Sequence, residues 1–188
     1  PALVRGGSGF QVSFGRGVGF LAELRQKFVL NPYYRVVLKR SGKVRSVGWL
    51  SGACLLARRE AVEAAGRFDE GLFIYFEDLD LCRRIGELGL ELLFDPSVRV
   101  VHWGGATTAP RKVRSRLHYR ESQLRYYEKH SAGMSLFLLK AYLRLSLTGM
   151  RLLRVRTAED KALLVRLREQ VSGRREVEKS WPGSRSSS

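Results

Sequence analysis

Cysteines, long apolar runs and acidic residues are all scarce in this chain of 188 residues. The two cysteines, Cys54 and Cys82, do not form a C-x-x-C motif, which argues against a zinc ribbon or a dithiol redox site. We expect both to be reduced, buried thiols. No uncharged apolar run approaches the roughly 20 residues that span a bilayer, and the longest run near the end, residues 131–139, is broken by Lys140.

The shortage of acidic residues gives the chain a strong positive charge. It contains 34 Lys+Arg against 18 Asp+Glu, a formal net charge of +16. That balance favours anionic partners, which include nucleic acid, an anionic membrane surface and phosphorylated substrates, without choosing among them. Hydrophobic residues make up 44% and charged residues 28%, as in globular proteins, and the length suits one domain of ordinary size.

Alternating strand-like and helical patterns place residues 1–110 in the α/β class. We expect a strand within 10–14, helices over 18–30, 59–65 and 78–88, and further strands over 47–50, 54–57, 90–94 and 98–102. Gly66 and Gly89 should end the second and third helices. The chain begins with Pro1 in glycine-rich, strand-like sequence, so we expect it to be the C-terminal part of a longer protein.

The pattern changes after residue 110. Residues 111–171 predict a basic, amphipathic helical extension, with one interruption near 131–133. Residues 172–188 are rich in Arg, Ser and Gly, a composition typical of a disordered tail.

An acidic cluster stands out in the segment from Gly66 to Arg84, G-R-F-D-E-G-L-F-I-Y-F-E-D-L-D-L-C-R-R. Glu77, Asp78 and Asp80 lie within four positions, and carboxylates that close together on partly apolar ground are hard to keep ionised. Proteins usually bear that cost where a base or a metal is needed. Asp78 or Glu77 at a helix start could accept a proton from a substrate hydroxyl. Simple capping of the helix explains the same residues.

Two further features are candidates for binding. His102 ends an apolar strand before W-G-G-A-T-T, at the edge where open α/β sheets hold ligands, and could bind a divalent metal. A histidine that only hydrogen-bonds a neighbouring loop is the alternative. The basic run over 111–120, which includes Arg111 and Arg114, suits phosphate oxygens. A solvated basic helix face explains it equally well.

A basic stripe follows in residues 134–155. On a helix, Lys140, Arg144, Arg151 and Arg154 fall within roughly 80° of one another, and most remaining positions are apolar. This pattern is typical of a helix that lies in a membrane interface. The alternative is a helix that packs onto the α/β body and exposes the stripe.

Several motifs occur in order: S-G-A-C-L-L-A-R-R (51–59), the segment 66–84, G-L-E-L-L-F-D-P (89–96) and V-R-V-V-H-W-G-G-A-T (98–107). Together they resemble the C-terminal half of the glycosyltransferase family 2 catalytic domain, especially its bacterial rhamnosyltransferase-like members, over about residues 45–130. The resemblance implies a partial GT-A (Rossmann-like) domain. This domain lacks its N-terminal nucleotide-binding half and is followed by C-terminal amphipathic helices.

The resemblance also implies a reaction. A sugar, with rhamnose as one candidate, would pass with inversion from a nucleotide-diphosphate donor to a cell-envelope polysaccharide or lipid-linked acceptor. Asp78 would be the general base, supported by Glu77 and Asp80. Arg84 matches a structural arginine of the family.

Other positions take roles from the same resemblance. Trp49, Ser51 and Gly52 match part of the acceptor-side wall, and His102 matches a ligand of Mg²⁺ or Mn²⁺ in some relatives. The family's D-x-D metal motif should lie upstream, and this chain contains none before Asp78. We therefore expect the isolated chain neither to bind donor properly nor to turn over.

Two other hypotheses remain open. A non-catalytic basic module could bind an anionic membrane or nucleic acid, since phosphate attraction needs only Lys and Arg. No nucleic-acid module pattern is present, so nucleic acid is not an expected partner. A truncated gene product that folds poorly is the other possibility. For the enzyme, we expect a cytoplasmic location at the inner face of the membrane, with peripheral contact through residues 134–155.

Overall fold

The computed structural model describes residues 1–4, 9–17, 19–26, 43–103, 112–131, 133–150 and 158–173. The chain divides into two compact units. The first, here the α/β unit, comprises Pro1–Phe68 and Glu77–Thr107, and the second, the helical unit, comprises Asp69–Phe76 and Thr108–Ser188. The chain therefore leaves the α/β unit for eight residues and returns to it at Glu77, inside the acidic cluster.

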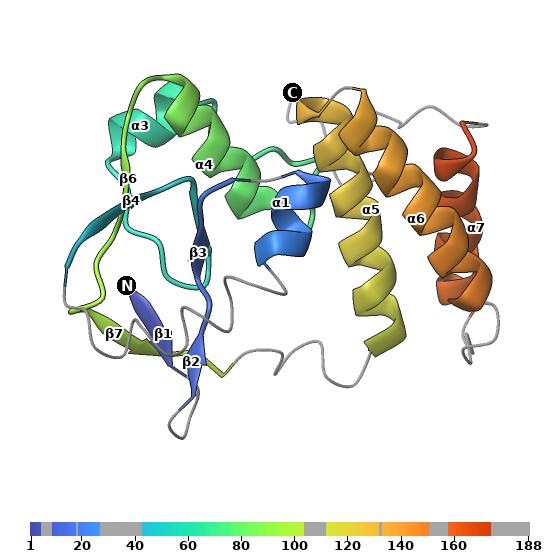
Figure 1. Ribbon diagram of the computed structural model, residues 1–188, viewed down its shortest axis with the longest axis horizontal. Helices are drawn as coiled ribbons and strands as arrows, with labels where there is room; N and C mark the ends of the chain where they lie inside the picture. Colours follow the sequence, from blue (N-terminus) through green and yellow to red (C-terminus); the bar gives the residue numbers. More distant parts are fainter. Residues whose placement is uncertain are drawn as a thin grey trace, which may run out of the picture. The chain divides into compact units, whose positions relative to one another are not determined.

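The strands described in the α/β unit are short and form three small sheets (Figure 1). The three-stranded sheet has the order β2-β1-β7, with β1 antiparallel to β2 and parallel to β7. Two antiparallel pairs, β3 with β5 and β4 with β6, complete the set. The bounds are β1 (Ala2–Val4), β2 (Phe10–Gln11), β3 (Phe14–Gly15), β4 (Arg45–Val47), β5 (Trp49–Leu50), β6 (Leu92–Phe94) and β7 (Arg99–Val101). Mixed strands and helices with a small parallel pairing fit the predicted α/β class.

Among its described residues, the same unit contains the helices α1 (Phe20–Arg25), α3 (Arg59–Ala64) and α4 (Glu77–Glu87). Gly66 and Gly89 follow α3 and α4 with φ of +79° and +76°, a backbone conformation that glycine adopts without steric cost. Both predicted glycine stops are thus confirmed. The helix predicted over 18–30 is observed as α1, and residues 27–30 lie outside the described part.

The strand predicted over residues 54–57 is wrong. Cys54–Ala57 form no ladder, because the chain turns directly after β5. Ser51 closes this turn: its carbonyl accepts a 3.4 Å hydrogen bond from Cys54 N–H, and its hydroxyl accepts one of 3.3 Å from Ala53 N–H. The apolar letters of the segment do not share one environment, since Leu55 packs on the core while Leu56 is 96% exposed.

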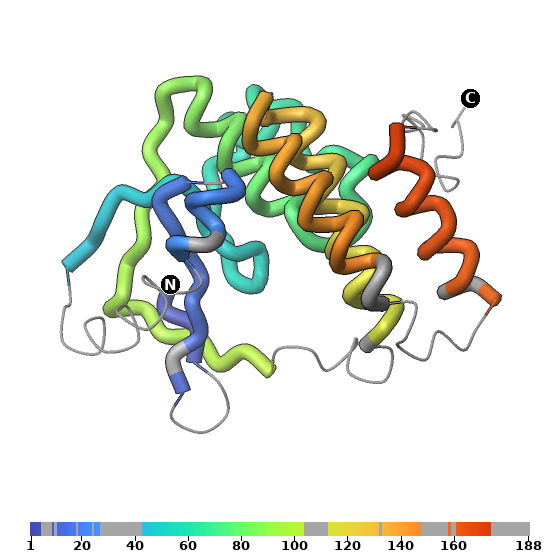
Figure 2. Tube along the Cα trace, turned by 45° about the vertical axis from the view of Figure 1, so that its right-hand side comes forward, coloured from blue at the N-terminus to red at the C-terminus, as the bar shows by residue number. Residues whose placement is uncertain are grey.

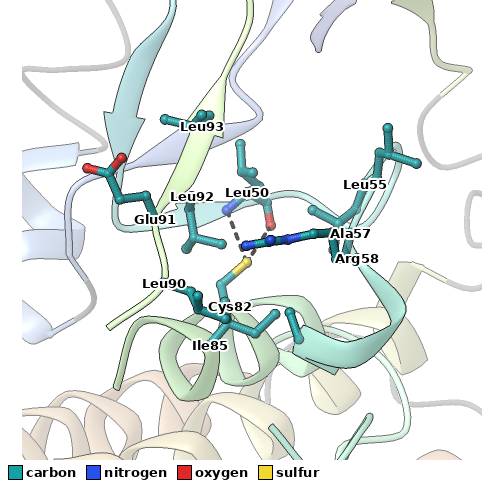
Figure 3. A pocket seen from close by; sticks show the side chains of 12 residues that line it. Leu50, Leu55, Ala57, Arg58, Cys82, Ile85, Leu90, Glu91, Leu92 and Leu93 are labelled. Carbon is teal, nitrogen blue, oxygen red and sulfur yellow. Dashed lines mark hydrogen bonds between the residues drawn. The ribbon is translucent and has the colours of Figure 1, made fainter. Parts of the chain in front are cut away.

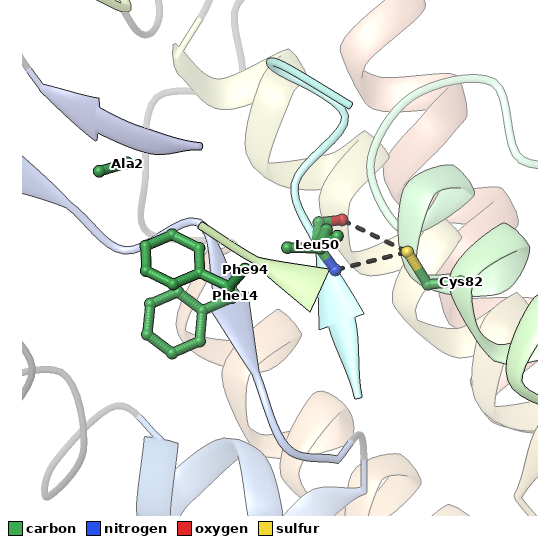
Figure 4. Packing of buried hydrophobic residues seen from close by; sticks show 5 residues of the cluster. All are labelled: Ala2, Phe14, Leu50, Cys82 and Phe94. Atoms are coloured by element: carbon green, nitrogen blue, oxygen red, sulfur yellow. Dashed lines mark hydrogen bonds between the residues drawn. The ribbon is translucent and has the colours of Figure 1, made fainter. Parts of the chain in front are cut away.

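The core of the α/β unit joins strands to α4 (Figure 4). Its buried members are Ala2, Phe14, Leu50, Cys82 and Phe94. The rings of Phe14 and Phe94 lie 4.1 Å apart between centroids. The Cys82 thiol accepts a hydrogen bond from Leu50 N–H (3.4 Å) and donates one to Leu50 C=O (3.6 Å). This contact fixes α4 against the end of β5, directly before the turn at Ser51.

The helical unit contains α5 (Lys112–His130), α6 (Met134–Met150) and α7 (Ala158–Val171). Figures 1 and 2 show these three helices side by side, and each packs on the other two. The predicted interruption is confirmed at Gly133, which takes φ of +69° between α5 and α6. The tail predicted over 172–188 lies outside the described residues from 174 onward. Across the described ranges, none of the helices has the length and hydropathy needed to cross a membrane.

The short segment 69–76 lies along α5 in the helical unit. Lys129 binds Asp69 at 2.7 Å, and the Ser122 hydroxyl donates a 2.7 Å hydrogen bond to the carbonyl of Ile74. Phe76 is buried against aromatic rings of the same helix. The residues that lead into the acidic cluster are therefore anchored by several independent contacts.

Candidate active site

Asp78 is the second residue of α4, and backbone amides hold both of its carboxylate oxygens. Gly52 N–H donates a 2.7 Å hydrogen bond to Oδ2, and Leu79 N–H donates one of 2.9 Å to Oδ1. Gly52 belongs to the turn after β5, so the site joins that turn to the start of α4. Each carboxylate oxygen can accept more than one hydrogen bond. The side chain is thus fixed in orientation while keeping capacity to accept a proton.

The two neighbouring carboxyls at the start of α4 are hard to ionise. Burial raises the pKa of Asp78 above its ordinary value, and the hydrogen bonds from Gly52 and Leu79 oppose that effect. Burial also raises the pKa of Glu77, its own backbone N–H lowers it, and the charge of Asp78 raises it further. A carboxylate with a raised pKa is a stronger base and better suited to proton transfer near neutral pH.

Glycine at position 52 is needed for space. A Cβ atom there would lie 3.2 Å from Asp78 Cβ and 3.6 Å from Oδ2. The first distance is shorter than ordinary van der Waals contact, so a larger residue would displace the Asp78 side chain or the turn. The turn itself is fixed to the core strands by a 2.8 Å hydrogen bond from Ser51 N–H to the carbonyl of Ser13. The structure thus brings Ser51, Gly52 and Asp78 to one place, as the predicted site requires.

Trp49 lies on β5 and is half-buried. It is paired with Gly15 of β3, and its indole occupies the space that a side chain at position 15 would fill. Trp49 also packs against the core cluster of the α/β unit. Much of its surface therefore supports the strands that carry the Ser51 turn.

Asp80 and Arg84 form a framework beneath the site. Asp80 is fully buried, and Arg84 binds its Oδ2 through Nη2 at 2.5 Å and Nε at 2.9 Å. Arg84 also donates to the carbonyls of Ala65 and Arg67, the second at 2.7 Å. The pair therefore ties α4 to the end of α3. With no exposed surface, Asp80 serves the position of the helix and does not contact a substrate in this arrangement.

His102 follows β7 of the three-stranded sheet, whereas the acidic cluster lies on helix α4. Its Nδ1 lies 3.1 Å from Oε1 of Gln11, and its backbone N–H donates a 2.8 Å hydrogen bond to Val4 C=O. Within the described residues, no group of three or more His, Cys, Asp and Glu side chains could hold a metal ion. One histidine with its Nδ1 beside an amide does not by itself fit Mg²⁺ or Mn²⁺, cations that prefer several oxygen ligands. No catalytic step is therefore assigned to a metal here.

The two predicted arginines belong to the helical unit or lie outside the described residues. Arg114 is half-buried on α5 of the helical unit, and Arg111 lies outside the described residues. In the described part of the chain, His102 shares no hydrogen bond with Glu77, Asp78 or Asp80. The geometry therefore supports one compact group, made by the Ser51 turn and the start of α4.

Two features of the site were missed by the sequence analysis. Tyr75 and Phe76 have positive φ, 66° and 64°, immediately before Glu77. That conformation is costly for residues other than glycine, and it persists only where surrounding contacts impose it. The second feature is Oε2 of Glu77, which is buried and has no hydrogen-bond partner among the described residues. No sequence pattern predicts either feature, because both result from the contacts that position the start of α4.

A separate cavity of about 220 Å³ opens beside the core (Figure 3). Its lining is mostly apolar and comes from β5, the segment before α3, α3, α4 and β6, with Arg58 and Glu91 as its charged members. Cys82 lines it, and burial raises the pKa of that thiol to about 11. None of the predicted site residues that the structure describes lines this cavity, and its apolar walls do not suit sugar hydroxyls.

Comparison with known proteins identifies relatives over part of the chain. It is 39% identical over 112 residues to the N-acetylglucosaminyl-diphospho-decaprenol L-rhamnosyltransferase of Mycobacterium tuberculosis, in strains CDC 1551 / Oshkosh and H37Rv. That match covers 58% of this chain and 34% of the relative. It is 35% identical over 57 residues to rhamnosyltransferase WbbL of Escherichia coli K12, covering 30% of this chain and 22% of the relative.

The predicted resemblance to rhamnosyltransferases is thus confirmed over part of the chain. The chain spans about a third of the length of the mycobacterial relatives it matches. No protein-family model matches the chain. No solved structure matches it either.

Proposed function

We propose that this chain is the acceptor-side part of an inverting glycosyltransferase with a partial GT-A domain. The observation that carries the proposal is the 39% identity to a rhamnosyltransferase over 112 residues. The site supports the same function, because the carboxylate of Asp78 is oriented by two amides and has a raised pKa. The donor-binding half would lie in sequence beyond this chain, so the isolated chain would not turn over.

Asp78 acts in this proposal as the general base. Its carboxylate takes the proton of the acceptor hydroxyl while the hydroxyl oxygen forms a bond to the anomeric carbon of the donor sugar. The bond from that carbon to the nucleotide diphosphate breaks, and the diphosphate leaves with the electron pair. Attack on the face opposite to the leaving group inverts the anomeric carbon. Gly52 positions Asp78 for this step through its N–H.

The names of the relatives suggest the substrates. We propose a nucleotide-diphosphate sugar as donor, with rhamnose as the first candidate, and a saccharide on a polyprenyl diphosphate as acceptor. Such an acceptor serves the synthesis of a cell-envelope polysaccharide and would place the enzyme at the inner face of the membrane. Ser51 and Trp49 would border the acceptor, and Arg111 and Arg114 would face phosphate oxygens. A role for His102 on Mg²⁺ or Mn²⁺ would require further ligands from outside the described residues.

Transfer of radiolabelled rhamnose from its nucleotide-diphosphate donor to polyprenyl-diphosphate N-acetylglucosamine tests the function. The product of the complete reading frame and the 188-residue chain alone should be assayed in parallel. We expect transfer by the first and none by the second. In the active protein, Asp78→Asn should lower kcat by about 10²- to 10⁴-fold, the usual contribution of a general base.

Glu87→Gln provides the matched control, since it removes an exposed carboxylate from the same helix. It should leave kcat unchanged. Full turnover by the Asp78→Asn variant would exclude Asp78 as the base, but it would still support glycosyl transfer as the function. Absence of transfer by the complete product, with rhamnose and with other nucleotide-diphosphate sugars, would favour the basic binding module. The net charge of +16 is the observation that keeps this alternative open.

A further inference from the structure

Helix α6 has two apolar faces, and one of them packs against the other described helices of the helical unit. Leu139, Leu143 and Leu147 are buried on the side that meets α5 and α7. At about 100° per residue, the opposite side carries Met134, Phe137 and Leu145 within roughly 80° of one another. These three side chains are 69%, 64% and 77% exposed. We call them the outer strip of α6.

Cationic side chains border the outer strip on both sides. Lys140 and Arg144 follow one edge of it on the helix. Near the other edge, Arg120 of α5 donates a 2.8 Å hydrogen bond to the hydroxyl of Tyr142, and its guanidinium lies 5.0 Å from the centre of that ring. No acidic residue occurs in α6. The strip therefore runs between two sets of positive charge.

The contacts of Lys140 and Arg144 change the interpretation of the predicted basic stripe. Lys140 binds Glu128 of α5 at 3.0 Å, and Arg144 donates a 3.2 Å hydrogen bond to the carbonyl of Val171 in α7. Both cations thus help to hold the three helices together, and Arg151 and Arg154 lie outside the described residues. What α6 presents outward is an apolar strip edged by cations.

We propose that α6 docks on an anionic lipid surface by inserting the outer strip of Met134, Phe137 and Leu145 below the headgroups. Burial of exposed apolar area supplies the attraction. Arg120 and Arg144, which donate to a hydroxyl and to a carbonyl, can keep their guanidinium groups among lipid phosphates while their stems cover apolar surface, whereas Lys140 stays paired with Glu128. The inference does not depend on the proposed sugar transfer, because it rests on the surface of the helical unit alone.

Charge favours lipid over a second copy of this chain. A two-fold dimer through the outer strip would bring the cations that border it close to their own counterparts. Each copy carries a formal charge of +16, so the dimer would form against a strong mutual repulsion. An anionic bilayer instead neutralises the same cations, and their positions on both edges of the strip complement it.

Flotation of the 188-residue chain with lipid vesicles tests the proposal. Vesicles of phosphatidylcholine with roughly 30% phosphatidylglycerol are compared with pure phosphatidylcholine, at low and high salt. The informative variant is Phe137→Gln with Leu145→Gln, which removes apolar area and leaves every charge in place. Glutamine is a good helix former, and both positions are exposed, so the fold should survive. Val165→Gln, at an apolar position of α7 that is 53% exposed, is the control.

We expect the double variant to need about tenfold more anionic lipid for half-maximal binding, from the loss of two inserted apolar side chains. Val165→Gln should bind as the unmodified chain does. Equal binding by the double variant would overturn the proposal, because charge alone would then explain attachment. It is also overturned if no vesicle is bound, or if the chain is a dimer in solution that the double variant converts to a monomer. None of these results depends on a sugar donor. The membrane-docking proposal can therefore fail while the proposed sugar transfer holds, and the reverse is also true.

Discussion

The backbone N–H of Gly52 and the carboxylate of Asp78 form a 2.7 Å hydrogen bond across 26 positions of sequence. The same glycine leaves space that a side chain would fill, since a Cβ there would approach Asp78 Cβ to 3.2 Å. The N–H of Gly52 orients the carboxylate of Asp78, the proposed base. The absence of a side chain at position 52 allows Asp78 to lie against the turn. Gly52 is therefore a positioning residue for Asp78.

Substitution of Gly52 by alanine should displace Asp78 without removing it. The added methyl group forces the carboxylate or the turn to shift by a few tenths of an ångström, which weakens the hydrogen bond. Because that bond lowers the pKa of Asp78, we expect the pKa to rise further. A carboxyl ¹³C NMR titration of the 188-residue chain measures this directly. In the active protein we expect kcat to fall by about tenfold to a hundredfold, since small misplacements are costly in catalysis.

Gly86→Ala is the matched control, because a Cβ at that position of α4 meets nothing within 4 Å. It should leave the pKa of Asp78 unchanged and stabilise the helix by up to about 1 kcal/mol. Should Gly52→Ala leave both the pKa and kcat unchanged, the positioning role would be excluded.

The start of α4 shows what the sequence alone can supply. The three carboxylates and the glycine stops were enough to indicate a helix and its bounds within a residue, and the family resemblance singled out Asp78 as the candidate base. The separate motif S-G-A-C was assigned to the same site through the family resemblance, and the structure adds the hydrogen bond that joins them. Periodicity and local composition indicate such elements well because they depend on residues close in sequence.

Contacts distant in sequence could not be predicted in the same way. Asp80 and Arg84 are spaced for an i,i+4 ion pair, yet no local signal shows that Arg84 also donates to the carbonyls of Ala65 and Arg67, 19 and 17 positions away, and so places Asp80 in the framework. Two consecutive aromatic residues with positive φ also contradict local preference. The strand expected over 54–57 failed because a turn at Ser51, and not apolar character, decides that path.

Loss of Arg84 should unfold the chain more readily than loss of its neighbour. Arg84→Met removes the guanidinium that binds the buried carboxylate of Asp80, which we expect to lower the free energy of unfolding by about 3–5 kcal/mol. Arg83→Met, the control, breaks only an exposed pair with Glu87 and should cost less than about 1 kcal/mol. Urea unfolding followed by circular dichroism measures both. Equal losses for the two variants would contradict the framework role.

Removal of the Asp78 charge should stabilise the fold at neutral pH. Since the native pKa of Asp78 is raised, the native state binds its proton more tightly than the unfolded chain does. The stability contributed by this group therefore falls as pH rises from about 4, the unfolded value, through the native pKa. The Asp78→Asn variant does not lose stability in this way as pH rises, and it also removes the negative charge beside Glu77. We expect its melting temperature to exceed that of the unmodified chain at pH 8, by a margin that shrinks towards pH 4.

Asp95→Asn should show the opposite trend. Hydrogen bonds from the hydroxyl and the N–H of Ser97 lower the pKa of Asp95. Its contribution to stability is therefore present above the unfolded pKa and is lost as pH falls through the native value. The variant should be the less stable one at pH 8, with a deficit that fades in acid. Parallel pH trends for the two asparagine variants would show that a general charge effect, and not the two local environments, sets these pKa values.

Cys82 should resist thiol reagents while the protein is folded. It is fully buried, is hydrogen-bonded to both backbone groups of Leu50, and has a pKa raised to about 11, so almost no reactive thiolate is present near neutral pH. In a Cys54→Ser variant at pH 7.5, we expect modification by a disulfide reagent only at the rate of unfolding, and immediate modification in denaturant. The Cys82→Ser variant, which keeps Cys54, gives the rate of modification of a half-buried thiol for comparison. Rapid labelling of Cys82 in the native state would mean that α4 separates readily from β5, and with it the turn that holds Asp78.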